Sequence, residues 1–355
     1  MSDLGASNTY TPFQPPGDAS SESTYFAGAI SGIPRYLFRV YDWSSSGFTS
    51  RSEVCSPAFG TLPKDLFRQP REDAAAMLNA HLRWKCCGRE SHKLLGGREC
   101  NLMSWTSSLL FALQYALYRH KTQDAKPQLS EIKILMVDTR DLCDRNVFTR
   151  DLQTIRAFKQ YPPSDQDGLG EVDDWRSSGS YYFGEYLSQG RLVLKPEQCC
   201  EVTMKDLVDR GLFKICAGLG DSEHWHRLAT RVNGLRRRAR PKTALSEDAL
   251  QVVIDVAEAF EGFEVPAALR LLGLSPFHAR EGGGRMAHDA IEGLPKTDGS
   301  RGVVCDSSSS LGGHHDHLPE LQHCQYWYDV FAGLSAPKVE DEDGDLIDEL
   351  ARLVL

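Results

Sequence analysis

The chain has 355 residues, of which 41% are hydrophobic and 25% are charged. These are ordinary values for a globular protein of about two domains, and they exclude disorder over the whole chain. The formal net charge of -9 gives no basic footprint, so bulk electrostatics do not indicate a nucleic-acid partner.

The expected setting of the chain is the cytoplasm. The first residues have neither the basic start nor the apolar stretch of a secretory signal, and no apolar run is long enough to span a bilayer. Ten cysteines in such a chain predict reduced thiols and not a disulfide framework. The adjacent cysteines at 86–87 and 199–200 lack the spacing of a zinc site, so no metal is expected. The basic run at residues 236–242 is a nuclear address, a contact for an anionic partner, or an exposed linker.

The first half of the chain begins with a polar segment and continues with a strand and a helix. Residues 1–30 are rich in Ser, Thr, Pro and Gly, which predicts a disordered leader. Residues 36–41 form a short aromatic and β-branched run, which is typical of a strand. Residues 65–84 carry apolar side chains, together with His81, at steps of three and four, and this spacing predicts an amphipathic helix.

A strand followed by a helix is the next predicted unit. Residues 102–107 read as a strand that leads into a helix over residues 109–120, and residues 132–137 predict a central strand. The polar insertion at residues 160–180 predicts a mobile loop beside a site.

Two short strands, over residues 181–187 and 191–194, are predicted about a turn at residues 188–190. Further on, Ser246 caps a predicted helix over residues 246–260.

These segments predict an α+β fold. We expect one main domain over residues 31–216 and a helical annex over residues 217–277. A disordered linker at residues 278–318, rich in Gly, Ser and His, precedes a C-terminal segment at residues 319–355 with an acidic linker and a short helix.

Arg39 and the turn at residues 104–107 are candidate binding groups. Arg39 lies in an apolar strand, so its guanidinium should meet a carboxylate or a phosphate, with an ordinary salt bridge as the alternative. Ser104, Thr106 and Ser107 place three hydroxyls where a strand enters a helix, and helix capping alone explains one or two of them. Trp105 offers a flat wall for a nicotinamide or adenine ring, or else is a core residue.

Glu185 is the candidate catalytic residue. It lies in an apolar, strand-like run directly after Tyr181, Tyr182 and Phe183, where a carboxylate suggests function. Cleavage of a glycosidic bond passes through an oxocarbenium-like cation, which a carboxylate stabilises.

An Arg in the first strand, a Thr-Ser turn that opens a helix, and a later Glu resemble the R-S-E class of ADP-ribosyltransferases. The stretches at residues 34–40 and 104–116 also look like an uncharacterised fungal domain family. The resemblance covers residues 31–216, and it implies split mixed or antiparallel β-sheets with flanking helices. It also implies NAD as substrate and no metal.

In that family Arg39 would contact NAD phosphate or ribose. Thr106 and Ser107 would shape the nicotinamide-ribose pocket, and Glu185 would be catalytic. Trp105 departs from the usual Ser-Thr-Ser turn, and Phe183 stands where arginine-modifying members carry Gln or Glu. The acceptor therefore stays open between a protein, a small molecule and water. The alternative is a catalytically inactive module for protein recognition or self-recognition.

Overall fold

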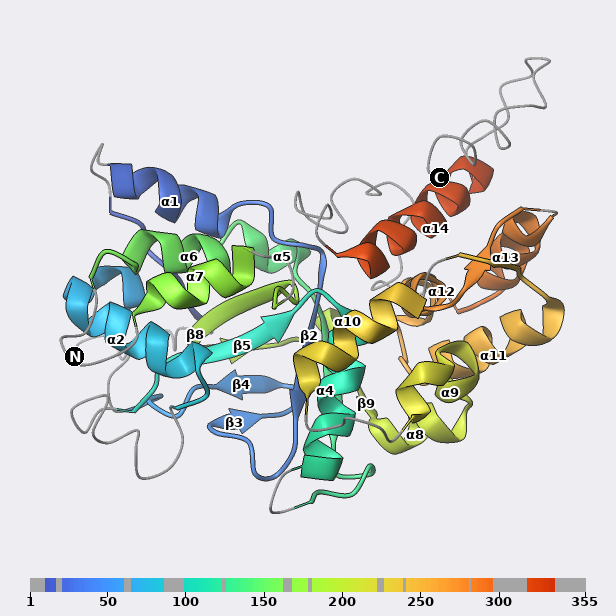
Figure 1. Cartoon of the computed structure of the whole chain (residues 1–355), viewed down its shortest axis with the longest axis horizontal. Helices are drawn as coiled ribbons and strands as arrows, with labels where there is room; N and C mark the ends of the chain where they lie inside the picture. Colours follow the sequence, from blue (N-terminus) through green and yellow to red (C-terminus); the bar gives the residue numbers. More distant parts are fainter. Residues whose placement is uncertain are drawn as a thin grey trace, which may run out of the picture. The chain divides into compact units, whose positions relative to one another are not determined.

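The computed structural model describes eleven stretches of the chain: residues 10–16, 21–60, 65–85, 99–122, 126–161, 168–177, 181–221, 227–238, 241–280, 282–295 and 318–335. These residues form a mixed α+β structure, as the sequence predicts (Figure 1). They group into two compact units, and the chain enters each unit more than once. The first unit takes residues 1–33, 44–107 and 138–198, and the second takes residues 34–43, 108–137 and 199–355.

Strand β8 organises the sheet of the first unit. It runs from Glu185–Val193 and pairs antiparallel with four other strands. They are β1 (Tyr10–Thr11), β4 (Glu53–Cys55), β5 (Leu102–Thr106) and β7 (Thr149–Arg150). A short strand, β3 (Phe48–Thr49), extends the sheet beyond β4.

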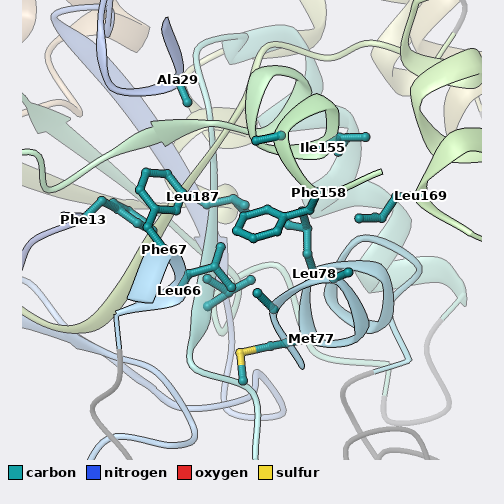
Figure 2. Close-up of a cluster of buried hydrophobic side chains, with 14 of the residues drawn as sticks. Phe13, Ala29, Leu66, Phe67, Met77, Leu78, Ile155, Phe158, Leu169 and Leu187 are labelled. Atoms are coloured by element: carbon teal, nitrogen blue, oxygen red, sulfur yellow. The ribbon is translucent and has the colours of Figure 1, made fainter. Parts of the chain in front are cut away.

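Helices of the first unit bury a compact aromatic core. Those that contribute to it are α1 (Ser21–Ile30), the 3-10 turn η1 (Leu66–Arg68), α2 (Arg71–Leu82), α6 (Asp151–Phe158) and α7 (Leu169–Ser177). The first unit also contains α5 (Arg140–Cys143) and, after β8, the 3-10 turn η2 (Pro196–Gln198). Figure 2 shows Phe13, Phe67 and Phe158 in this cluster together with Leu187 of β8. Burial of each large aromatic side chain contributes a few kcal/mol, so this cluster fixes the helices on the sheet.

The prediction of a disordered leader over residues 1–30 is wrong for the described part. Residues 21–30 form α1, and Phe26 and Ala29 of this helix are fully buried. The Phe26 ring lies 4.6 Å from that of Phe67 and 5.5 Å from that of Phe158, measured between centroids. Phe13 is also fully buried. The few apolar residues of this polar segment therefore contribute directly to the core.

Two predictions in the region of residues 160–194 are also corrected. Residues 169–177 of the supposed loop form helix α7, which buries Leu169 and Val172. The turn predicted at residues 188–190 lies inside the continuous strand β8. Gly190 has a φ of 60° there, and a Cβ on it would collide with the side chain of Thr11 in β1. This glycine therefore allows a close strand approach and does not end the strand.

The second unit contains three strands of one sheet together with the described helices that follow residue 198. Its strands follow the order β2 (Tyr36–Tyr41), β6 (Lys133–Asp138) and β9 (Cys199–Thr203), and β6 pairs antiparallel with β9. Helix α4 (Leu109–Thr122) and the short helices α8 (Met204–Asp209), α9 (Leu212–Ile215) and η3 (Ala217–Gly220) belong to the same unit.

Five longer helices complete this unit: α10 (Leu228–Arg238), α11 (Glu247–Ala257), α12 (Glu264–Leu274), α13 (Gly283–Glu292) and α14 (Pro319–Ser335). The short strands β10 (Thr243–Ala244) and β11 (Phe277–His278) pair in parallel. Helix α14 packs closely on α12, because Gly273 has no Cβ to collide with the backbone of Cys324. Trp327 and Tyr328 of α14 are buried, so this helix belongs to the core.

The boundaries predicted in the C-terminal half differ from the units and helices of the structure. The second unit joins residues on both sides of the predicted boundary at residue 216. The linker predicted as disordered over residues 278–318 contains α13, which buries Ala287 and Ile291. Residues 296–317 and the acidic linker near residue 340 lie outside the described residues. Arg236 of the supposed exposed basic run is buried and ion-paired to Glu320.

Candidate functional site

The turn at residues 104–107 and Glu185 lie on neighbouring strands. Thr106 is the register partner of Glu185, and Ser104 is the partner of Leu187. Directly opposed residues of an antiparallel pair have Cα atoms about 4.5–5.5 Å apart and point their side chains to the same face. Ser104, Thr106, Glu185 and Leu187 therefore share one face of the β5–β8 pair, which we call the Glu185 face.

The hydroxyls of this turn hold the backbone that precedes β8. Thr106 Oγ1 donates a 2.6 Å hydrogen bond to the carbonyl of Phe183. The N–H of Ser107 donates to the carbonyl of Gly184 at 2.8 Å, and its hydroxyl donates to the same oxygen at 3.3 Å. Both side chains are buried. Their direct effect is to fix the position from which Glu185 projects.

Helix α4 is capped by the next residue. Ser108 Oγ accepts a 3.1 Å hydrogen bond from the N–H of Phe111, which is the role expected of an N-cap serine. Capping therefore does not require the hydroxyls of Thr106 or Ser107.

Trp105 points to the opposite face of β5, because side chains alternate along a strand. It is 2% exposed, and its indole N–H donates a 2.8 Å hydrogen bond to Ser188 Oγ. Its ring meets Phe148 edge-on at 5.5 Å. The structure thus places Trp105 in the core, which was the alternative to a wall against a ligand ring.

Glu185 is engaged by an arginine from α7. Arg176 Nη2 donates to Glu185 Oε1 at 2.7 Å, and Nη1 contacts the other carboxylate oxygen. The same guanidinium lies 3.3 Å from Oδ2 of the fully buried Asp151, and it also donates to the carbonyl of Tyr181 at 2.8 Å. One cation therefore lies between two carboxylates in a largely buried position.

Burial has opposite effects on the two partners of this cluster. Loss of solvent raises the pKa of Asp151 and lowers the pKa of Arg176, since it disfavours the charged form of each. Each charge opposes the shift of the other, because the pair is close. Sequence reasoning missed both residues, and Arg176 in particular lies in a polar segment with no motif of its own.

Ser104 makes a contact that its position in the sequence does not suggest. Its side chain is exposed, and its Oγ lies 2.7 Å from Nε2 of His81, in the last turn of α2. A signal for His81 was present, because this histidine occupies an apolar position in the periodic pattern of its helix.

Arg39 belongs to β2 of the second unit. Burial lowers its pKa to about 10, and the neighbouring charge of Arg119 acts in the same direction. Arg119 itself forms two 2.7 Å hydrogen bonds with Asp42. The proximity of Arg39 to Glu185 stays a prediction, as does its contact with a phosphate.

Comparison with known families covers the segment that contains all of these predicted site residues. A domain of unknown function, DUF7587, spans residues 32–192. This region contains Arg39, the turn at residues 104–107 and Glu185, and it agrees with the resemblance to an uncharacterised domain family. No curated protein and no solved structure matches the chain.

The residues that the structure describes contain no group of three or more His, Cys, Asp or Glu side chains that could hold a metal ion. None of the described helices has the length and apolar character needed to cross a membrane.

Proposed function

We propose that the DUF7587 region binds NAD and cleaves the bond between nicotinamide and ribose, with Glu185 as the catalytic residue. The observation that carries this proposal is the register pairing of Thr106 with Glu185 on one strand pair. Residues 79 positions apart in the chain thereby combine a hydroxyl turn and a carboxylate, which are two of the three elements expected from the resemblance to ADP-ribosyltransferases.

The chemistry requires little more than one well-placed carboxylate. As nicotinamide leaves, positive charge develops on the ribosyl group, and Glu185 stabilises this charge. Nicotinamide departs as a neutral molecule because it is cationic in NAD, so no general acid is needed to protonate it. Thr106 and Ser107 act by fixing the backbone of residues 183–184, from which Glu185 projects.

The mechanism must account for the ion pair between Arg176 and Glu185. While Arg176 is paired with Glu185, the carboxylate is not available to a developing cation. Asp151 gives Arg176 a second partner, so Glu185 can turn toward a ligand without leaving the guanidinium unpaired. We therefore propose that NAD binding separates Glu185 from Arg176.

The acceptor in this proposal is a protein, a small molecule or water. We place the reaction in the cytoplasm, on the basis of the cysteines. No disulfide joins the seven cysteines in the described part of the chain to one another.

A second function, recognition without turnover, is favoured by the same ion pair. If Arg176 is a permanent partner of Glu185, the carboxylate has a structural role and the fold serves as a recognition module. Arg39, Ser104, Thr106 and Ser107 would then have no cofactor to bind.

The test is NAD consumption by the full chain and by the Glu185→Gln variant. The amide keeps the shape and removes the charge, so turnover should fall on the order of 10²- to 10³-fold, whereas NAD binding measured by calorimetry should change little. Glu53→Gln is the matched control, since Glu53 is also paired to an arginine, Arg191, in the sheet of the first unit.

The outcomes separate the two functions. Equal turnover in the wild type and in Glu185→Gln would remove Glu185 from the mechanism. A wild-type chain that neither binds nor consumes NAD would refute the enzyme and leave the recognition module.

A further inference from the structure

His81, Ser104 and Cys100 form a hydrogen-bonded series in the first unit. His81 Nε2 lies 2.7 Å from Ser104 Oγ, and Nδ1 lies 3.2 Å from Cys100 Sγ. Ser104 is exposed, His81 is partly buried, and Cys100 is buried. A hydroxyl in hydrogen-bond reach of an imidazole that a third group orients is the arrangement of an activated nucleophile.

The contacts of Cys100 are compatible with the tautomer that activates Ser104. Its sulfur also lies 3.5 Å from the N–H of Leu102, so it is positioned to accept hydrogen bonds. When Nδ1–H of His81 donates to this sulfur, the lone pair on Nε2 faces the Ser104 hydroxyl. His81 is then in position to take the serine proton.

The position of Ser104 in its strand indicates which kind of electrophile it attacks. Acyl transfer needs N–H donors for an oxyanion, and hydrolases of the α/β type provide them by placing the serine at a tight turn between a strand and a helix. Ser104 lies instead inside β5, each residue of which pairs with β8. Attack on a ribosyl cation needs no oxyanion donors, because negative charge does not develop on the electrophile.

Ser104 also lies close to the carboxylate that would stabilise such a cation. It precedes Thr106 by two residues on the Glu185 face, a separation of about 7 Å along the strand. The ribosyl group of one NAD molecule held at Glu185 therefore lies within reach of the Ser104 hydroxyl.

We infer that Ser104 is an acceptor of ADP-ribose, so that the chain modifies itself with His81 as general base. This inference rests on the proposed NAD cleavage. The bond from the ribose C1 to the nicotinamide nitrogen breaks, with its electron pair leaving on nicotinamide. A bond from C1 to Ser104 Oγ forms, and the serine proton passes to His81 Nε2 and then to solvent. No oxidant or reductant is required.

The experiment is incubation of the full chain with NAD, followed by peptide mass spectrometry and measurement of released nicotinamide. One ADP-ribosyl group should be found on Ser104 and should be absent from Ser104→Ala. His81→Gln should lower the rate of modification on the order of 10²-fold or more, as expected for loss of a general base.

Two further variants guard against effects on folding. Ser104→Thr keeps a hydroxyl and should retain modification at residue 104. Ser52→Ala is the matched control, because Ser52 is an exposed serine of the same unit that contacts Ser50 and no histidine in the described part of the chain. This variant should be modified like the wild type.

Failure of this inference is distinguishable from failure of the proposed function. Nicotinamide release without ADP-ribose on Ser104, or equal modification of wild type and His81→Gln, overturns the role of Ser104 and His81 but leaves NAD cleavage intact. Absence of both nicotinamide release and NAD binding overturns the two together.

Discussion

Replacement of Glu320 by Gln should destabilise the second unit strongly. Glu320 of α14 is the partner of Arg236 in α10 through two 2.9 Å hydrogen bonds, and it accepts a 2.6 Å hydrogen bond from Ser108 Oγ, at the start of α4. The side chains of Arg236 and Glu320 are 5% and 0% exposed. Removal of the carboxylate charge leaves the buried guanidinium without the negative charge of Glu320.

The expected cost is about 3–5 kcal/mol, the range for breaking a buried ion pair from one side. Since each kcal/mol shifts the melting temperature by about 2–4 °C in a unit of this size, the shift should be on the order of 10 °C. Urea denaturation and differential scanning calorimetry measure these quantities. The double variant Arg236→Met with Glu320→Leu should recover much of the loss, because apolar residues of similar size do not require a counter-charge.

The matched control is Asp221→Asn, which breaks the ion pair of Arg238 on the same helix. The side chains of that pair are 65% and 48% exposed, so its removal should cost less than about 1 kcal/mol. A Glu320→Gln variant as stable as Asp221→Asn would refute the reasoning, since burial would then not determine how much an ion pair contributes to the free energy of unfolding.

Two further predictions concern the core and the pH dependence. Phe26→Ala should lower the free energy of unfolding by about 3–5 kcal/mol in chemical denaturation, because Phe26 is fully buried. Tyr25→Ala is the control and should cost far less, since Tyr25 is 42% exposed. Equal effects of the two substitutions would mean that residues 21–30 do not belong to the core. Burial lowers the pKa of His323 to about 4 from an ordinary value of 6.5, so the folded state resists protonation that the unfolded state accepts. The stability that neutral His323 confers is therefore complete above pH 6.5, and about 3 kcal/mol is lost as the pH falls from 6.5 to 4. Denaturation curves over this pH range should show the loss in the wild type and a smaller one in His323→Asn, and identical slopes would contradict the assignment.

Local patterns predicted the elements that a short stretch of sequence determines. Apolar residues at steps of three and four predicted the helix that became α2, and the strand and helix at residues 102–120 became β5 and α4. Ser246 is the N-cap of α11, with its side chain accepting a hydrogen bond from the N–H of Ala249. In each case propensity, periodicity and capping indicate the same structure.

The failures occurred where distant contacts determine the structure. Residues 1–30 are rich in polar residues as a whole, but Phe26 and Ala29 complete a core that is formed largely by other segments. Gly190 ends a Ser-Gln-Gly sequence that is typical of a turn, and only the close approach of Thr11 explains why a glycine lies inside the strand. Helix α13 begins at a run of glycines and is maintained by burial of Ala287 and Ile291. No local signal distinguishes these cases from loops.

The same division applies to the candidate site. The family resemblance implies that the turn at residues 104–107 and Glu185 belong to one site, but the register that pairs Thr106 with Glu185 is known only from the structure. Arg176 comes from α7, a helix in the segment that the sequence predicted as a loop. Asp151 comes from α6, a helix that the sequence did not predict. Their presence changes the chemistry, because Glu185 is not a solitary carboxylate in an apolar strand but one of two carboxylates that share a guanidinium.

The position of Arg176 between Asp151 and Glu185 bears on the choice between NAD cleavage and recognition without turnover. Asp151 is fully buried and has Arg176 as its cationic partner in the cluster, whereas Glu185 is partly exposed, with 16% of its side chain accessible. Desolvation makes the Asp151 pair the more costly of the two to break. Glu185 is thus the carboxylate that can leave the cluster, and a cation arising at the Glu185 face provides a reason for it to do so. A purely structural ion pair requires neither the second carboxylate nor the exposure of Glu185.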